Sequence, residues 1–204
     1  MASKFFAYLE RLRWIKRWGL MRNVIEENVM EHSWQVATIA HVLGLIHQYQ
    51  FDGQTDPKTI AVAALYHDVS EIITGDMPSP VKYHSEAISR AYKAIEEEAE
   101  KEVLNTLPET LQQPFAGLLL HQNNDPQVAN FVKAADIISA YLKCRLEVSA
   151  GNHEFKDAMQ DIEARIRQLD MPEVEYFMTV FTDSYLLSLD ELLNSHEPRP
   201  VRLP

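Results

Sequence analysis

The sequence predicts an all-α protein, a single bundle of about eight helices in 204 residues. Only six glycines are present, and no segment alternates apolar and polar residues for long enough to indicate a strand. Apolar residues make up 46% of the chain, which is enough to bury one sizeable core at this length. No linker, repeat or low-complexity block interrupts it, so we expect one domain over residues 1–204, with a frayed tail at about 195–204.

Helical periodicity and end signals place each helix in turn. Asn28, with Glu31 three residues later, forms the capping-box pattern that begins a helix. Pro57 suits the first turn of the third helix, and Gly151 is a stop signal after the sixth. Apolar stripes at helical spacing mark the others. The predicted helices cover residues 4–15, 29–49, 57–74, 86–107, 109–120, 126–150, 155–169 and 172–193.

Charge and hydropathy argue against several classes of protein. The net charge of −11 and the lack of a basic stripe argue against a nucleic-acid polymer as partner. No uncharged apolar run approaches the roughly 20 residues that a membrane-spanning helix needs, so we expect no membrane association of that kind. Charges near the N-terminus stand where a signal peptide needs an apolar stretch. The single Cys144 cannot form an intrachain disulfide, so we expect a cytoplasmic protein.

Four polar residues in helical segments are the candidate metal ligands, namely His32, His67, Asp68 and Asp136. Two imidazoles and two carboxylates suit one divalent ion such as manganese, cobalt, iron or zinc. Because His32, the adjacent pair His67-Asp68 and Asp136 are far apart in the sequence, they can meet only where helices converge in a bundle. We place His67 and Asp68 within the predicted 57–74 helix. Neighbouring side chains on a helix point about 100° apart, so both can bind one ion only if the ion lies against the edge of the helix between them.

Each of these residues also has a purely structural interpretation. His67 could be a hydrogen-bonded core histidine and Asp68 a buried capping partner, since buried polar groups usually find partners within the protein. For either residue alone, that interpretation is the better one. The four residues together favour a metal site, because an unpaired charge among apolar neighbours would cost several kcal/mol.

The order His…His-Asp…Asp on an all-helical chain resembles the HD-domain metal-dependent phosphohydrolases. Five blocks of sequence are similar to the 5′-deoxynucleotidase branch of that family, and the resemblance covers nearly the whole chain. One small departure is Asn28, where the branch is expected to have serine, and both residues cap helices well. The five blocks cover residues 17–24, 27–33, 66–71, 75–83 and 133–136.

The resemblance implies an HD-domain helical bundle that hydrolyses deoxyribonucleoside 5′-monophosphates to deoxynucleoside and phosphate. It also implies a homodimer and one divalent ion, cobalt, manganese or a similar metal, held by the four residues named above. The chemistry of the residues agrees with this activity. A phosphate monoester needs its charge neutralised and a water activated for in-line attack, and a divalent ion serves both needs.

The same resemblance implies roles for further residues. Glu71, four residues after His67, is predicted to be the general base for the attacking water. Asp76 is predicted to donate a proton or to orient groups near the leaving oxygen or the sugar. Arg17 is expected to clamp the phosphate, because its planar guanidinium matches phosphate oxygens. Trp18 is expected to close the sugar pocket and leave no room for a 2′-hydroxyl.

The segment after Asp76 is predicted to complete the substrate site. Its residues are Met77, Pro78 and Ser79, and the hydroxyl or amide of Ser79 is expected to contact phosphate or sugar. Simpler interpretations exist here too. Glu71 could be a surface carboxylate, Asp76 a turn residue, and the arginine–tryptophan pair a surface ion pair with a packing aromatic.

Three alternative functions stay open at this point. Another HD phosphohydrolase, acting on a cyclic nucleotide, an alarmone or a nucleoside triphosphate, would need more basic residues near the metal than Arg17 alone. A di-iron oxygenase on the same scaffold would recruit His84 and His121 as ligands. A non-catalytic nucleotide sensor predicts the loss of a ligand or of Glu71, and this chain retains all of them.

Overall fold

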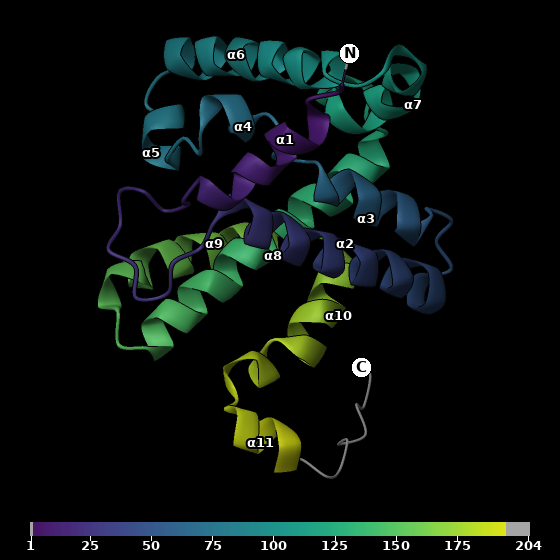
Figure 1. Cartoon of the computed structure of the whole chain (residues 1–204). Coiled ribbons are helices and arrows are strands. Elements are labelled where there is room, and N and C mark those ends of the chain that lie inside the picture. Colours follow the sequence, from purple (N-terminus) through teal and green to yellow (C-terminus); the bar gives the residue numbers. More distant parts are fainter. Residues whose placement is uncertain (1, 195–204) are drawn as a thin grey trace.

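The computed structural model describes residues 2–194, and all the regular elements in that range are helices (Figure 1). The predicted all-α class is therefore confirmed. The frayed tail predicted at 195–204 lies outside the described residues. The elements, with η for short 3₁₀ helices, are α1 (Phe5–Leu9), η1 (Glu10–Trp14), α2 (Val29–Phe51), α3 (Pro57–Leu65), α4 (Glu71–Thr74), α5 (Ser79–Lys82), α6 (Glu86–Asn105), α7 (Glu109–Leu119), η2 (His121–Asn123), α8 (Pro126–Ser149), η3 (His153–Phe155), α9 (Lys156–Gln168), α10 (Pro172–Phe181), η4 (Asp183–Leu186) and α11 (Leu189–Asn194).

Two long helices, α2 and α8, form the centre of the fold. Helix α2 packs against α3 and α8, and α8 also packs against α9. Helix α6 lies at the top of the molecule in the view of Figure 1, where it contacts α4, α5 and α7. Helix α10 packs against α2, η4 contacts α8, and α11 then leads away from the body of the molecule (Figure 1). We call α10, η4 and α11 the C-terminal arm.

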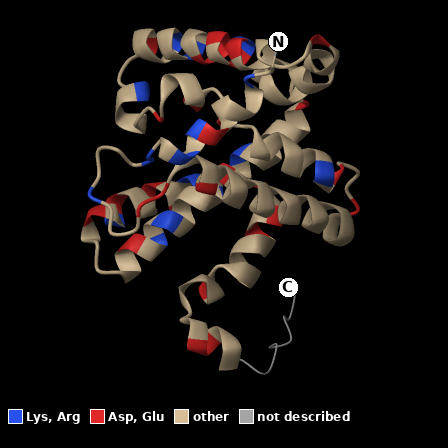
Figure 2. Cartoon of the chain, in the orientation of Figure 1, with Lys and Arg blue, Asp and Glu red and all other residues tan. Residues whose placement is uncertain are grey.

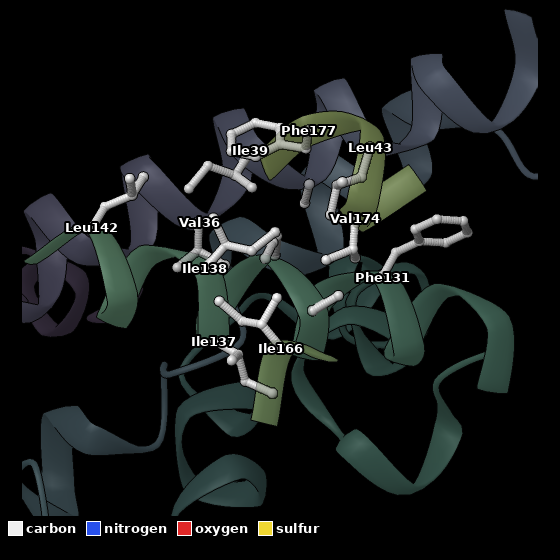
Figure 3. Close-up of a cluster of buried hydrophobic side chains, with 14 of the residues drawn as sticks. Val36, Ile39, Leu43, Phe131, Ile137, Ile138, Leu142, Ile166, Val174 and Phe177 are labelled. Atoms are coloured by element: carbon white, nitrogen blue, oxygen red, sulfur yellow. The ribbon is translucent and has the colours of Figure 1, made fainter. Parts of the chain in front are cut away.

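The main core lies between α2, α3, α8, α9 and α10, and a second core joins α1, α6 and α7. The main core includes Val36, Ile39, Leu43, Ile138 and Leu142 (Figure 3). The second core contains Phe5, Val69, Val103, Leu107 and Leu119. Since Ala64 belongs to the first cluster and Val69 to the second, the turn between α3 and α4 lies at the junction of the two cores.

The helix that the sequence predicts over 57–74 is interrupted, so this prediction is wrong at residues 66–70. Helix α3 ends at Leu65, and the following backbone N–H groups bond three residues back, as from His67 to Ala64. The His67 ring also donates from Nδ1 to the Ala64 carbonyl at 2.7 Å. A continuous helix would offer that carbonyl to the N–H of Asp68, so the imidazole competes with the helical ladder.

The last predicted helix, over 172–193, is also interrupted. Helix α10 ends at Phe181, and α11 begins only at Leu189. Arg145 of α8 donates from Nη1 to the Thr182 carbonyl at 2.8 Å, and the Tyr185 N–H, three residues on, donates to the same carbonyl at 3.3 Å, so the chain continues as a 3₁₀ turn. Two smaller differences occur elsewhere, because the second half of the predicted 4–15 helix is the 3₁₀ helix η1 and the loop after Asp76 contains the short α5.

Surface charge follows the composition of the chain. In the view of Figure 2, Lys and Arg are scattered among Asp and Glu along the described helices and do not gather in one stripe. Within residues 2–194, no helix combines the length and the apolar character needed to cross a membrane.

Leu43 is fully buried in the main core, so its truncation tests the packing of α2. We expect Leu43→Ala to lower the free energy of unfolding by about 2–5 kcal/mol, because it removes apolar contacts and leaves a cavity. Urea denaturation measures this loss. Leu65→Ala, on the partly exposed side chain at the end of α3, is the matched control and should cost much less. Equal losses in both variants would contradict the described core.

Candidate active site

The turn between α3 and α4 presents His67 and Asp68 to one point. Since a carbonyl oxygen only accepts hydrogen bonds, the contact with Ala64 requires a hydrogen on Nδ1 of His67. The ring's Nε2 is therefore an unprotonated acceptor in the neutral imidazole, and it lies 3.2 Å from Oδ2 of Asp68. The break in the helix thus brings these two adjacent side chains together, which an unbroken helix would direct about 100° apart.

His32 reaches the same point from the first turn of α2. Its side chain is fully buried, and its Nδ1 lies 3.2 Å from the Ser139 hydroxyl. Its Nε2 lies 3.4 Å from Oδ2 of Asp68 and 3.1 Å from Oδ1 of Asp136 on α8. The sequence places His32 just after the cap of α2, and the structure agrees.

These contacts form the one group of three or more possible metal ligands within residues 2–194. Ligand atoms of His32, His67 and Asp68 all lie within 4.8 Å of one another, and Asp136 adjoins them through His32. The Nε2 atoms of both histidines are buried and make no hydrogen bond. Two nitrogen lone pairs that face carboxylate oxygens require a proton or a cation between them. The donor set therefore fits one divalent metal ion.

Charges within the cluster shift the pKa values of its members. Burial and the charge of Arg17 lower the pKa of His32, but the adjacent carboxylates of Asp136, Asp68 and Glu27 outweigh them and raise it well above its ordinary value. Burial raises the pKa of Asp68, yet the neighbouring histidines hold it well below its usual range. The same pocket thus favours positive charge on the imidazole side and negative charge on the carboxylates.

Arg17 lies beside the cluster because the chain before α2 folds back on itself. The Arg17 N–H donates to the Glu27 carbonyl at 3.0 Å, and the Val29 N–H donates to the Ile15 carbonyl at 3.0 Å. This pairing places the Arg17 guanidinium 3.4 Å from Oδ2 of Asp68 and 3.4 Å from Oε2 of Glu27. Burial lowers the pKa of Arg17, but the carboxylates around it raise it further, so the side chain stays charged.

Trp18 is held in a backbone conformation that bulky residues rarely adopt, with φ of 59°. Its indole Nε1 donates to Oε2 of Glu27 at 2.7 Å, and its ring packs against Phe155 with centroids 5.3 Å apart. Such strain at a non-glycine residue persists only where the surroundings impose it. Trp18 is therefore held in one position beside Arg17.

The loop that carries Arg17 and Trp18 is tied to α8 by a buried carboxylate. Glu147 accepts hydrogen bonds from the Val24 and Ile25 N–H groups, both at 3.0 Å, and Lys143 pairs with the same carboxylate. Burial raises the pKa of Glu147, but these hydrogen bonds lower it to about 2. The charged carboxylate therefore anchors the loop at neutral pH.

Glu71 and Asp76 add two further carboxyl groups to the pocket. Burial and the charges of Asp68 and Asp76 raise the pKa of Glu71 to about 9, and its Oε2 is buried with no hydrogen bond. Burial also raises the pKa of Asp76, although Arg17 and a hydrogen bond from the Trp18 N–H act in the opposite direction. Glu71 begins α4, so the turn, and not a position on one helix with Asp68, brings it near that carboxylate.

The other predicted residues are less closely linked to the cluster. Met77 and Pro78 are partly buried, and Ser79, at the start of α5, is exposed. Among the described residues, no hydrogen bond or ion pair joins these three to the cluster, so their contact with substrate stays a prediction. His84 is exposed, whereas the ring of His121 is bound by Glu100 and by the backbone of His67.

Two residues of the site escaped the sequence analysis. Glu27 contacts Arg17, Trp18 and His32, and Ser139 contacts His32. Ser139 stands three residues after Asp136, so helical spacing alone would have placed both on one face of α8. Glu27 precedes the cap of α2, where a local pattern offers no distinction between a solvated glutamate and a buried one.

The family model described as 5′-deoxynucleotidase YfbR-like matches residues 4–185 of the chain. A 5′-deoxynucleotidase of Vibrio atlanticus is 47% identical over 190 residues, which cover 93% of this chain and 98% of the relative. A 5′-deoxynucleotidase of Cronobacter sakazakii is 50% identical over 190 residues, which cover 93% of this chain and 96% of the relative.

Two solved structures share the fold. An HD-domain phosphohydrolase from Listeria innocua matches with a TM-score of 0.78 and 24% identity, covering 94% of this chain and 92% of that chain. The cyanophage S-2L HD phosphohydrolase, bound to dA and one catalytic Zn²⁺ ion, matches with a TM-score of 0.65 and 20% identity, covering 88% and 95%. At these identities the likeness establishes the fold, an HD-domain helical bundle as expected.

The raised pKa of Glu71 predicts how the stability of the metal-free protein depends on pH. The folded value of about 9 lies above the roughly 4.3 of an unfolded glutamate. The stabilisation that this carboxyl contributes is therefore complete below about pH 4.3 and is lost as pH rises through 9. We expect metal-free Glu71→Gln to be more stable than wild type at pH 9 by roughly 1 kcal/mol or more, with the difference vanishing near pH 4.

Urea denaturation in the presence of a chelator, repeated across this pH range, measures the difference. Glu98→Gln, on an exposed position of α6, is the matched control and should follow the wild type at every pH. If Glu71→Gln loses stability with rising pH as the wild type does, the raised pKa of Glu71 is contradicted.

Proposed function

The chain belongs to the 5′-deoxynucleotidase YfbR-like family and is a phosphomonoester hydrolase of that kind, and we propose that His32, His67, Asp68 and Asp136 form its reaction centre. The observation that carries this proposal is the convergence of two unpaired, buried imidazole nitrogens on the Asp68 carboxylate. We take the substrate to be a deoxyribonucleoside 5′-monophosphate. The activity printed for the relatives supports that choice.

The four residues would hold one divalent transition metal, for which cobalt and manganese are our candidates. When bound, the ion supplies Lewis-acid chemistry, since it offsets the phosphate charge and makes a water molecule easier to deprotonate. The zinc ion and the dA in the cyanophage phosphohydrolase support a metal and a deoxynucleoside at this kind of site. His67 is preset for such binding, because its bond to the Ala64 carbonyl directs Nε2 inward.

Glu71 is the proposed acceptor of the proton from the attacking water. A general base works best when its pKa lies near the working pH. The value of about 9 holds for a pocket crowded with carboxylates, and positive charge beside Asp68 lowers it toward neutrality. The buried, unpaired Oε2 of Glu71 leaves one oxygen available for that water.

Arg17 and Trp18 are the proposed substrate contacts. The Arg17 guanidinium lies beside Asp68, where it can bind phosphate oxygens and orient the ester for attack. Trp18, fixed by Glu27 and Phe155, would stand as a rigid wall against the sugar and exclude a 2′-hydroxyl sterically. Asp76 accepts from the Trp18 N–H, and its raised pKa suits a group that donates a proton to the leaving oxygen.

Two further features of the proposal concern the whole protein. The C-terminal arm exposes apolar side chains, with Leu189 70% and Leu193 64% accessible, and an exposed apolar surface of this kind is typical of an interface. It supports the expected homodimer. The single, buried Cys144 supports a reducing, cytoplasmic location.

The reaction is tested by phosphate release from dAMP, AMP and 3′-dAMP after the protein is stripped of metal and supplied with Mn²⁺ or Co²⁺. We expect release from dAMP, far less from AMP and none from 3′-dAMP. Glu71→Gln should lower kcat about 10²–10⁴-fold, because it removes the proton acceptor. Equal rates with AMP and dAMP would contradict the role of Trp18, and no release from metal-loaded protein would contradict the reaction centre.

The phosphate clamp is tested separately by Arg17→Ala. We expect kcat/KM for dAMP to fall about 10²–10³-fold, the range found when a charge-stabilising donor is removed from an active site. Arg22→Ala is the matched control, since Arg22 is exposed and pairs with Glu154. Losses of similar size in the two variants would show that Arg17 does not act on the phosphate.

A further inference from the structure

We propose that Ser139, Gln35 and Tyr185 are positioning residues that hold the imidazole of His32 in its metal-binding state. This inference rests on the proposed function, because it takes His32 to be a metal ligand. It goes beyond that function in linking the metal site to the C-terminal arm through a continuous chain of hydrogen bonds.

The chain of contacts runs outward from the back of the His32 ring. Nδ1 of His32 lies 3.2 Å from the Ser139 hydroxyl. That hydroxyl donates to Oε1 of Gln35 at 2.6 Å, and Nε2 of Gln35 donates to the Tyr185 hydroxyl. These residues come from α2, α8 and η4, so three separate elements meet behind one candidate ligand.

The direction of these hydrogen bonds, that is, which group donates in each, matters because it sets the tautomer of His32. A hydroxyl has one hydrogen, and Ser139 gives it to Gln35, so Ser139 can only accept from the histidine. Nδ1 must then carry the ring hydrogen, which leaves Nε2 with the lone pair that a metal requires. If donors and acceptors were exchanged along this series, Ser139 would donate to Nδ1 and a hydrogen on Nε2 would point at Asp136.

Glu27 selects the productive direction. Its Oε1 lies 3.7 Å from Nδ1 of His32. Its other oxygen, Oε2, accepts from the Trp18 indole Nε1 at 2.7 Å and lies 3.4 Å from Nε of Arg17. Glu27 is thus surrounded by donors and serves as an acceptor, and it therefore favours a hydrogen on Nδ1 of His32. Glu27 and Ser139 thus impose the same tautomer on His32.

Tyr185, the last residue in this series of hydrogen bonds, is held in place by α8. Arg145 donates to the Thr182 carbonyl at 2.8 Å and lies 3.6 Å from Asp183, which fixes the start of η4 and hence Tyr185. Gln35 is only partly buried and borders an open surface pocket of about 500 Å³, so packing does not enclose its amide on that side. The bond to Tyr185 therefore determines where that amide lies.

The test is the affinity of metal-stripped protein for Mn²⁺ or Co²⁺, measured by calorimetric titration, with the visible spectrum of bound Co²⁺ as a second readout. We expect Ser139→Ala to weaken binding about 10–100-fold, as removal of support behind a ligand histidine does. Ser139→Thr, which keeps the hydroxyl, should restore it. Gln35→Met should weaken binding less, and Tyr185→Phe least. Ser149→Ala, on the exposed end of α8, is the matched control.

The outcomes separate this inference from the function on which it rests. Wild-type protein that binds no metal would overturn the proposed reaction centre and the inference with it. Wild-type binding with Ser139→Ala and Gln35→Met within about twofold of it, and with an unchanged Co²⁺ spectrum, would overturn the positioning role alone. Failure of Ser139→Thr to restore affinity would do the same, because a merely structural loss is not repaired by the hydroxyl.

Discussion

The competition for the Ala64 carbonyl is the local interaction on which the geometry of the site depends. The His67 ring takes that carbonyl at 2.7 Å, and the backbone turns there instead of continuing as a helix. Because of this turn, His67 and Asp68 face the same point, and Glu71 begins a new helix near Asp68. A single side-chain hydrogen bond thus ends a helix, sets a tautomer and directs a nitrogen into the pocket.

The pocket concentrates negative charge that the protein only partly neutralises. Asp68, Asp136, Glu71 and Asp76 surround a region whose nearest basic side chain is Arg17. Crowded buried carboxylates are costly unless a cation, a proton or a hydrogen bond compensates them. The raised pKa values of Glu71 and Asp76 express that cost, and a metal ion would relieve it. The same excess of negative charge therefore favours the cation that the chemistry needs.

Support for this pocket comes from parts of the fold that lie behind it. Glu147 ties the loop before α2 to α8 through two backbone N–H groups, and this loop carries Arg17 and Trp18. Ser139 on α8 stands behind His32, and the C-terminal arm reaches the same histidine through Tyr185. Helix α8 thus contributes the candidate ligand Asp136, Glu147, which anchors the loop of Arg17 and Trp18, and Ser139, which supports the candidate ligand His32.

The sequence by itself determined most of the helix positions, the capping box at Asn28 and the residues of the candidate cluster. These features depend on spacing of three or four residues and on side-chain chemistry, both of which are local. The break after Leu65 is also local, but helical periodicity does not register it, because it comes from the His67 ring binding the Ala64 carbonyl. The tertiary structure decided the break after Phe181, where Arg145 from another helix binds the Thr182 carbonyl. It also decided that Glu27 and Ser139 meet His32, since contacts between distant segments depend on how the helices pack and not on the pattern within any one of them.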